Sequence, residues 1–130
     1  MTKVLAGGAF NSFHRGHEYF LKEARKLGDF LVVVIACDET VLKNKGYLLR
    51  PASERKRLVE QSGLADRVII GDRKDFMKTV GKEKPDIVAL GYDQEFDETV
   101  LRKAGCRVAR IGKLEGYSTR KMLQKKPISS

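Results

Sequence analysis

The sequence predicts an α/β protein in which one five-stranded parallel sheet is covered by helices on both faces. Short apolar runs alternate along the chain with segments of helical periodicity, and this alternation is typical of parallel sheets with right-handed crossovers. The 130 residues match the length of a single domain with one core. No linker, internal repeat or low-complexity segment divides residues 1–130. We therefore expect one domain.

Five apolar runs are predicted to be strands. The first, Val4–Ala6, is expected to end at Gly7 and Gly8, where the absence of a Cβ atom lets the backbone pass close to a bound group. The second, Phe30–Ala36, is a continuous run rich in β-branched residues, which is typical of a strand buried on both faces. The other three predicted strands are Arg67–Gly71, Pro85–Gly91 and Cys106–Ile111.

The segments between the strands carry the helical pattern. Residues Gly16–Leu27 place their apolar side chains on one face of a helix. A second helix is expected to begin at Ser53, with Leu58 and Val59 directed inward. The segment Val41–Pro51 lacks periodicity and is predicted to be a basic loop. The other predicted helices are Asp75–Lys82, Phe96–Ala104 and a last turn at Arg120–Lys125, before a flexible tail at residues 126–130.

The amino-acid composition limits the classes of partner that the chain can bind, but it does not identify one of them. The formal charge of +9 favours anionic partners: nucleic acid, an acidic membrane surface or phosphorylated small molecules. The basic residues are spread over most elements, so nucleic acid is not the favoured partner. No apolar run approaches the ~20 residues of a membrane span, and the first residues carry no signal-peptide pattern. Cys37 and Cys106 are expected to be buried thiols in a cytoplasmic protein.

The carboxyl ends of the predicted strands indicate where a ligand binds. In open parallel sheets, ligands bind past these ends, at the point where the strand order reverses. The segments at these ends are Gly7-Gly8, Gly71, Gly91 and the loop after Ile111. We expect them to face one crevice.

Two histidines, His14 and His17, stand where the first loop enters the first helix, with Gly16 between them. A helix start presents unpaired N–H groups and the positive end of the peptide dipoles, so it attracts phosphate. Imidazoles at this place add hydrogen-bond donors, which suits a nucleotide's phosphates. Two alternatives stay open at this point. The rings can be exposed polar groups, or they can ligate a metal, although the chain has no third histidine.

The same stretch resembles the signature of the cytidylyltransferase-like nucleotidyltransferases, in which a glycine, a small or hydroxyl residue and Phe-Asp precede H-x-G-H. Here it reads Gly8-Ala9-Phe10-Asn11 and His14-Arg15-Gly16-His17. The resemblance extends from Val4 to about Leu123. It implies a Rossmann-like fold and an enzyme that joins an NTP to a phosphorylated small molecule with release of pyrophosphate. Two positions depart from the signature, since Asn11 replaces the usual Asp and Ala9 replaces the usual Thr or Ser.

The resemblance also implies roles for individual residues. His14, His17 and Lys45 would act on the phosphates as the catalytic residues, and Asn11 would lie on the acceptor side. The residues that would surround the nucleotide are Gly7, Gly8, Ala9, Phe10, His14, Arg15, Gly16, His17, Arg55, Gly91, Asp93, Tyr117, Ser118 and Thr119. Three of these residues have simpler alternatives. Lys45 can be a solvated loop lysine, Arg55 a surface arginine and Ser118 an ordinary helix cap.

Several acceptors are compatible with the resemblance. The short chain and the G-Y-D-Q stretch after the fourth strand look most like the archaeal FAD synthases, which transfer AMP from ATP to FMN. Glycerol-3-phosphate cytidylyltransferases are close behind, because the stretch Glu115–Thr119 fits them as well. Sugar-phosphate (heptose) adenylyltransferases of the lipopolysaccharide core type are third. The resemblance further implies ATP or CTP as a substrate and a divalent ion such as Mg²⁺, for which no ligating residue is assigned. The protein is expected to be a monomer or a homodimer.

A hypothesis of another class is a nucleotide- or nucleic-acid-binding module without catalysis. The basic charge and the departures at Ala9 and Asn11 motivate it. Pyrophosphate release distinguishes the two classes, because a binding module would show only salt-dependent affinity for its ligand.

Overall fold

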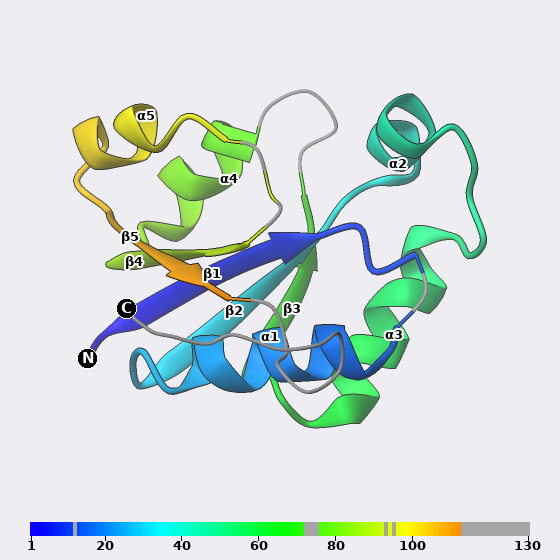
Figure 1. Cartoon of the computed structure of the whole chain (residues 1–130), viewed down its shortest axis with the longest axis horizontal. Coiled ribbons are helices and arrows are strands. Elements are labelled where there is room, and N and C mark those ends of the chain that lie inside the picture. The colour runs from blue at the N-terminus through cyan, green and yellow to red at the C-terminus, as the bar shows by residue number, and fades with distance from the viewer. Residues whose placement is uncertain (12, 72–75, 93, 95, 113–130) are drawn as a thin grey trace.

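One open sheet of five parallel strands organises the chain (Figure 1). The computed structural model describes residues 1–11, 13–71, 76–92, 94 and 96–112. The strands are β1 Lys3–Gly8, β2 Phe30–Ile35, β3 Arg67–Ile70, β4 Ile87–Gly91 and β5 Arg107–Ile111. The helices are α1 Arg15–Arg25, α2 Asp38–Lys45, α3 Ala52–Ser62, α4 Phe76–Glu83 and α5 Glu98–Lys103. The predicted fold class is confirmed, whereas the predicted last turn at Arg120–Lys125 and the tail lie outside the described residues.

The strand order is β3-β2-β1-β4-β5. The chain adds β2 and β3 on one side of β1, then crosses to the other side of β1 and adds β4 and β5. β1 pairs with β2 along its whole length, from Lys3 to Gly8. It pairs with β4 only from Val4 to Ala6, which lies opposite Ala89. The strand order therefore reverses between β1 and β4, and their ladder stops before either strand ends. Ligands of open α/β sheets bind at this kind of switch point.

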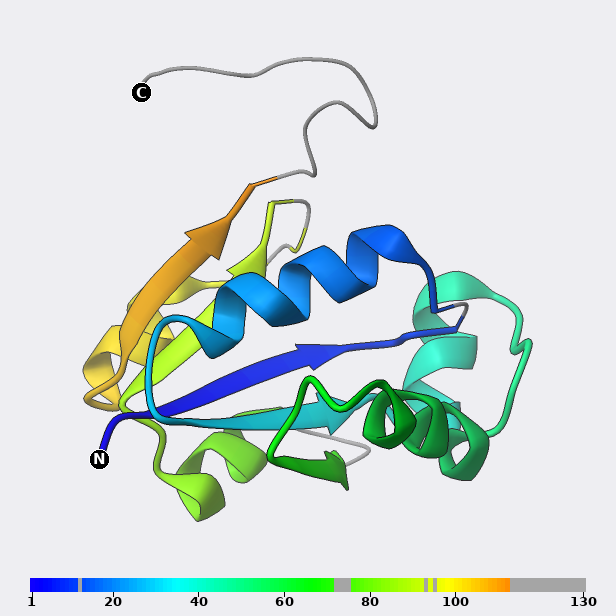
Figure 2. The same cartoon turned by 90° about the horizontal axis from the view of Figure 1, so that it is seen from below.

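Each face of the sheet carries its own hydrophobic core, as expected for strands that are buried on both sides. Val4 and Ala6 of β1 point to the face covered by α1 and α3, whereas Leu5 points to the face covered by α4 and α5. Figure 1 shows α1 and α3 on one side of the sheet and α4 and α5 on the other, and Figure 2 shows α1 running alongside β1. Every residue of β2 from Leu31 to Ile35 is buried, which confirms the prediction for this strand.

The structure refines one predicted element and corrects another. The first strand does end at the glycines, but both belong to it: β1 stays paired with β2 through Gly7 and Gly8, and Gly8 is its last residue. The first part of the predicted basic loop, Val41–Lys45, belongs to helix α2, which Gly46 caps at its C-terminus. Gly46 adopts the left-handed conformation with φ 82°, and its N–H bonds to the Leu42 carbonyl at 3.0 Å. This conformation favours glycine, and it turns the chain sharply out of the helix.

The edge at the amino ends of the strands is joined by ion pairs. Glu83, at the end of α4, is only 9% exposed and forms ion pairs with two cations. Its Oε1 lies 3.2 Å from Lys3 Nζ of β1, and its Oε2 lies 3.1 Å from Arg67 Nη2 of β3. A buried carboxylate is stable when it is paired in this way. Glu83 therefore connects α4, β1 and β3 at the edge opposite the carboxyl ends of the strands.

The two cysteines are free thiols. Cys106 is buried as predicted, and burial raises the pKa of its thiol. Cys37 is only half-buried, since it precedes α2 at the carboxyl end of β2. In the described part of the chain, no helix has the length and apolarity that crossing a bilayer requires.

Candidate functional site

His14 and His17 cap helix α1 reciprocally. His14 is the N-cap residue, and its Nδ1 accepts a hydrogen bond from the Gly16 N–H at 3.0 Å. The N–H of His14 in turn donates to Nδ1 of His17 at 3.3 Å. The pattern is that of a capping box, with imidazoles in place of a hydroxyl and a carboxylate. Because each Nδ1 is an acceptor, a neutral ring carries its proton on Nε2, and each Nε2 is a donor.

Aromatic packing holds the two imidazoles in place. The ring centroids of His14 and His17 are 4.0 Å apart. His17 also stacks on Phe13, with centroids 5.9 Å apart and planes at 11°, and lies 5.2 Å from Phe10. Phe10 is 3% exposed and has a positive φ of 52°, so its buried ring fixes a strained loop conformation. The imidazoles are thus positioned before any ligand arrives.

Two glycines make this arrangement possible. A Cβ atom on Gly8 would lie 2.9 Å from Cε2 of Phe10. A Cβ atom on Gly16 would lie 2.9 Å from Cε1 of His14. Both distances are shorter than carbon–carbon contact allows. The glycine inside H-R-G-H is therefore required by the ring of the first histidine.

Substituting Gly16 by alanine separates stability from activity. The new methyl group pushes the His14 ring off its position, and a displacement of this size lowers the catalytic rate by up to about 100-fold. The same change adds a better helix former to the first turn of α1. We therefore expect a melting temperature at or above wild type together with a large loss of turnover.

The matched control for this experiment is Gly81→Ala in α4. A Cβ atom there meets nothing within 4 Å, so we expect helix stabilisation of up to about 1 kcal/mol with full activity. Wild-type turnover by Gly16→Ala would contradict the positioning of His14.

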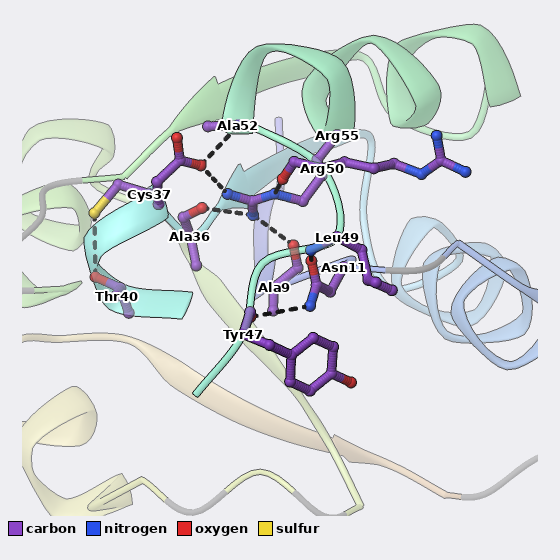
Figure 3. A network of polar contacts seen from close by, with 11 residues as sticks. Ala9, Asn11, Ala36, Cys37, Thr40, Tyr47, Leu49, Arg50, Ala52 and Arg55 are labelled. Carbon is purple, nitrogen blue, oxygen red and sulfur yellow. Dashed lines mark hydrogen bonds and ion pairs between the residues drawn. The ribbon is translucent and has the colours of Figure 1, made fainter. Parts of the chain in front are cut away.

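Arg55 extends from α3 toward the loops of the site and bonds to several of them (Figure 3). Its side chain is fully buried. Nη1 donates to the carbonyls of Ala9 and Ala36, which follow β1 and β2, at 2.7 Å each. Nε donates to the Arg50 carbonyl at 2.9 Å, and Nη2 pairs with Asp38 Oδ1 at 2.8 Å. The surface-arginine alternative is therefore wrong, and the geometry makes Arg55 a positioning residue rather than a direct contact of the nucleotide.

Asn11 uses both ends of its amide on the segment that precedes α3. The side chain is 8% exposed. Its Oδ1 accepts from the Leu49 N–H at 2.9 Å, and its Nδ2 donates to the Tyr47 carbonyl at 3.4 Å. A carboxylate could accept the first bond but could not donate the second. This gives a physical reason for an asparagine at this position.

Two residues that the sequence analysis did not assign, Gln94 and Arg110, organise the carboxyl ends of β1 and β4. Gln94 accepts from the Gly91 N–H at 2.7 Å and donates to the Gly7 carbonyl at 3.0 Å, so its amide bridges the strands where their ladder has ended. Arg110 donates to the carbonyls of Gly91 at 2.8 Å and Gln94 at 2.5 Å. It also bonds to Glu98 at 2.7 Å, which holds the pKa of that carboxyl below its usual value.

The other predicted site residues fall into two groups. Lys45 is exposed at the end of α2, and Arg15 is exposed at the start of α1. The predicted contacts Asp93, Tyr117, Ser118 and Thr119 lie outside the described residues. Within the described ranges, no three His, Cys, Asp or Glu side chains are grouped so that they could hold a metal ion.

A surface cavity of about 400 Å³ lies elsewhere, between the second half of α1 and the start of β3. Two of the cations that line it are paired with carboxylates: Arg25 with Asp66 at 3.1 Å and Lys26 with Glu23 at 2.9 Å. The cavity opens at the amino ends of the strands, so it is separate from the histidine pair.

Comparison of the chain with known proteins identifies one family. The family model described as cytidylyltransferase-like matches residues 5–130. The FAD synthase of Thermoplasma acidophilum is 41% identical over 97% of this chain and 94% of its own length. The FAD synthase of Ferroglobus placidus is 48% identical over 79% of this chain and 67% of its own length.

Solved structures agree with this match. A crystal structure described as the lipopolysaccharide core biosynthesis protein from Thermoplasma volcanium superposes with a TM-score of 0.82 at 42% identity, covering 88% of this chain and 99% of that one. Pantoate-beta-alanine ligase from Francisella tularensis shares the fold at a TM-score of 0.63 and 12% identity, over 85% of this chain and 59% of that one.

Proposed function

The chain belongs to the cytidylyltransferase-like family of nucleotidyltransferases, and from this premise we propose that it is an FMN adenylyltransferase, which makes FAD and pyrophosphate from ATP and FMN. The observation that carries the reaction type is the reciprocal cap of His14 and His17, which leaves each imidazole with its donor on Nε2. The observation that supports the acceptor is the near full-length match to an FAD synthase.

The reaction requires little covalent help from the protein. A phosphate oxygen of FMN attacks the α-phosphorus of ATP, the new O–P bond forms, and the bond to the β-phosphate oxygen breaks with its electron pair leaving on pyrophosphate. Negative charge is redistributed over the phosphoryl oxygens during transfer, so catalysis consists of positioning and electrostatic stabilisation. In our proposal, Nε2–H of His14 and His17 donates to these oxygens, beside the positive start of α1.

The remaining contacts follow from the same arrangement. We assign the nucleotide to the carboxyl ends of β1 and β4, where the ladder between the strands has ended and Gln94 bonds to both Gly7 and Gly91. Lys45 is assigned to a substrate phosphate because it is an exposed cation at the carboxyl edge. The predicted contacts of Asp93 with the nucleoside and of Tyr117, Ser118 and Thr119 with the leaving phosphates complete the proposal.

A divalent ion such as Mg²⁺ is expected with the nucleotide. The described side chains do not form a cage for it, and both ends of the Asn11 amide are occupied by backbone groups. Mg²⁺ is commonly bound through substrate phosphates with few protein ligands. We therefore assign no protein ligand to the ion and no catalytic step to it.

A sugar-phosphate adenylyltransferase is the second candidate. It is supported by the solved structure that is described as a lipopolysaccharide core biosynthesis protein. Both candidates share the phosphate chemistry of the histidine pair and differ only in the acceptor.

The test is a matrix of substrates with purified protein. ATP and CTP are each combined with FMN, glycerol 3-phosphate, heptose 1-phosphate and phosphopantetheine in the presence of Mg²⁺ or Mn²⁺, and pyrophosphate release is measured. We expect release with ATP and FMN, with FAD identified by chromatography. Release only with heptose 1-phosphate would select the second candidate. Folded protein that releases none in any combination, but binds nucleic acid with steep salt dependence, would be a binding module.

A further inference from the structure

We propose that the segment 45–49, which we call the acceptor segment, forms the binding surface for the ring of the acceptor, with Tyr47 as the flat wall on which the isoalloxazine stacks. This inference rests on the proposed function, because it identifies which part of the same site recognises FMN. Four observations on the described residues support it.

The first observation is exposed apolar surface on this segment. The side chains of Tyr47 and Leu49 are 55% and 59% exposed, although both are large and apolar. They are neighbours along a chain segment that is fixed at the carboxyl edge of the sheet. Two large exposed apolar side chains on one short segment that is held in place are consistent with a binding surface.

The second observation is that Asn11 holds the backbone of the acceptor segment. Its amide bonds to the Tyr47 carbonyl and the Leu49 N–H, so the residues that carry both exposed side chains are tied to the loop between β1 and α1. Asn11 stands three residues before His14, which belongs to the same loop. Figure 3 shows the Tyr47 ring beside the Asn11 amide and outside the hydrogen-bond network of Arg55. The ring is thus exposed but not loosely attached.

The third observation is the side of the sheet on which the segment lies. The nucleotide is assigned to the carboxyl ends of β1 and β4. The acceptor segment follows β2, which pairs with β1 on its other side. In the proposed function the two substrates meet at the histidine pair, and on that basis we assign the acceptor to the side of β1 on which the acceptor segment lies.

The fourth observation is the chemistry that the segment offers. Lys45, an exposed cation, stands two residues before Tyr47, and Gly46 turns the chain between them. A cation next to an exposed phenol suits a ligand that carries both a phosphate and a flat aromatic ring. FMN has both groups, whereas glycerol 3-phosphate and heptose phosphate have no aromatic ring. The acceptor segment therefore also determines specificity between the candidate acceptors.

The experiment compares Tyr47→Ala with Tyr47→Phe in steady-state FAD formation. Stacking of a flat ring on an aromatic side chain is lost in the alanine variant, and we expect the KM for FMN to rise roughly tenfold to hundredfold while the KM for ATP stays within about twofold. The phenylalanine variant keeps the ring and is expected to keep both KM values. Val100→Ala on α5, another exposed apolar residue, serves as the control and is expected to behave like wild type.

A fluorescence titration gives a readout that altered folding would not mimic. A tyrosine in contact with a flavin quenches its fluorescence by electron transfer, which a phenylalanine does not do. We expect bound FMN to be dim in the wild type and brighter in Tyr47→Phe at unchanged affinity.

Three results would overturn the inference while leaving the proposed function intact. The first is wild-type KM for FMN in Tyr47→Ala, and the second is equal quenching in wild type and Tyr47→Phe. The third is a change of oligomeric state in Tyr47→Ala with unchanged FMN kinetics, since this would make the surface a subunit interface. Failure of the proposed function is recognised separately, because the wild-type protein would then form no FAD from ATP and FMN.

Discussion

Replacing His14 by alanine is expected to lower the rate of AMP transfer by about 10²–10³-fold. The imidazole supplies a positioned donor through Nε2, and the loss of one such donor at a developing negative charge has an effect of this size. The substitution also removes the N-cap of α1, which costs about 1 kcal/mol of stability. Single-turnover formation of FAD at saturating substrates measures the rate, and urea unfolding measures the stability.

His14→Asn separates these two effects. Asparagine is among the best N-cap residues, so its side chain can accept the Gly16 N–H in place of Nδ1. It carries no imidazole, and its short side chain does not extend to where Nε2 lies. We expect stability close to wild type and the same large loss of rate. A His14→Asn enzyme at full rate would show that the ring only caps the helix.

Replacing Arg55 by alanine is expected to lower the free energy of unfolding by about 3 kcal/mol or more. The substitution leaves the Asp38 carboxylate without its cation and the carbonyls of Ala9, Ala36 and Arg50 without this donor. The loss is large because one fully buried side chain makes all of these bonds. Arg55→Lys is expected to recover only part of the loss, because an ammonium group cannot reproduce the fork of the guanidinium. Urea unfolding monitored by circular dichroism measures both variants.

Arg57→Ala is the matched control, since Arg57 is an exposed arginine on the same helix. A surface substitution of this kind changes stability by about 0.5 kcal/mol or less. An Arg55→Ala protein as stable as the Arg57→Ala protein would show that the buried network contributes little.

The fold could be predicted from the sequence wherever burial produces a pattern. The continuous apolar run of β2 indicated a strand buried on both faces, and it is one. Helix α2 was missed because it lies at the end of the sheet and buries only Val41. A helix with a single buried side chain has no apolar stripe, so periodicity cannot detect it.

The site could be predicted in part. The positions of His14 and His17 follow from the order of strand, glycines and helix start, all of which are local. The burial of Arg55 had a signal in the sequence, because Ala52, Arg55 and Val59 have the spacing of one helix face and all three are buried. This spacing places Arg55 on the face of α3 that packs into the core.

The two side-chain amides gave no comparable signal. Asn11 bonds to a carbonyl 36 residues away, and Gln94 bonds to one 87 residues away. Partners at such separations are brought together only by the packed sheet. Sequence periodicity reports which face a residue occupies, and it does not report which backbone group from another element comes to lie beside it.

The ion pairs of Glu83 have a practical consequence for handling the protein. They fasten Lys3 and Arg67 at the edge where β1 begins, whereas the histidine pair lies beyond the opposite end of the same strand. Met1 is 89% exposed at this fastened edge. A biosensor chip or chromatography matrix coupled through Met1 would hold the molecule at this edge and turn the histidine pair toward the flowing solution.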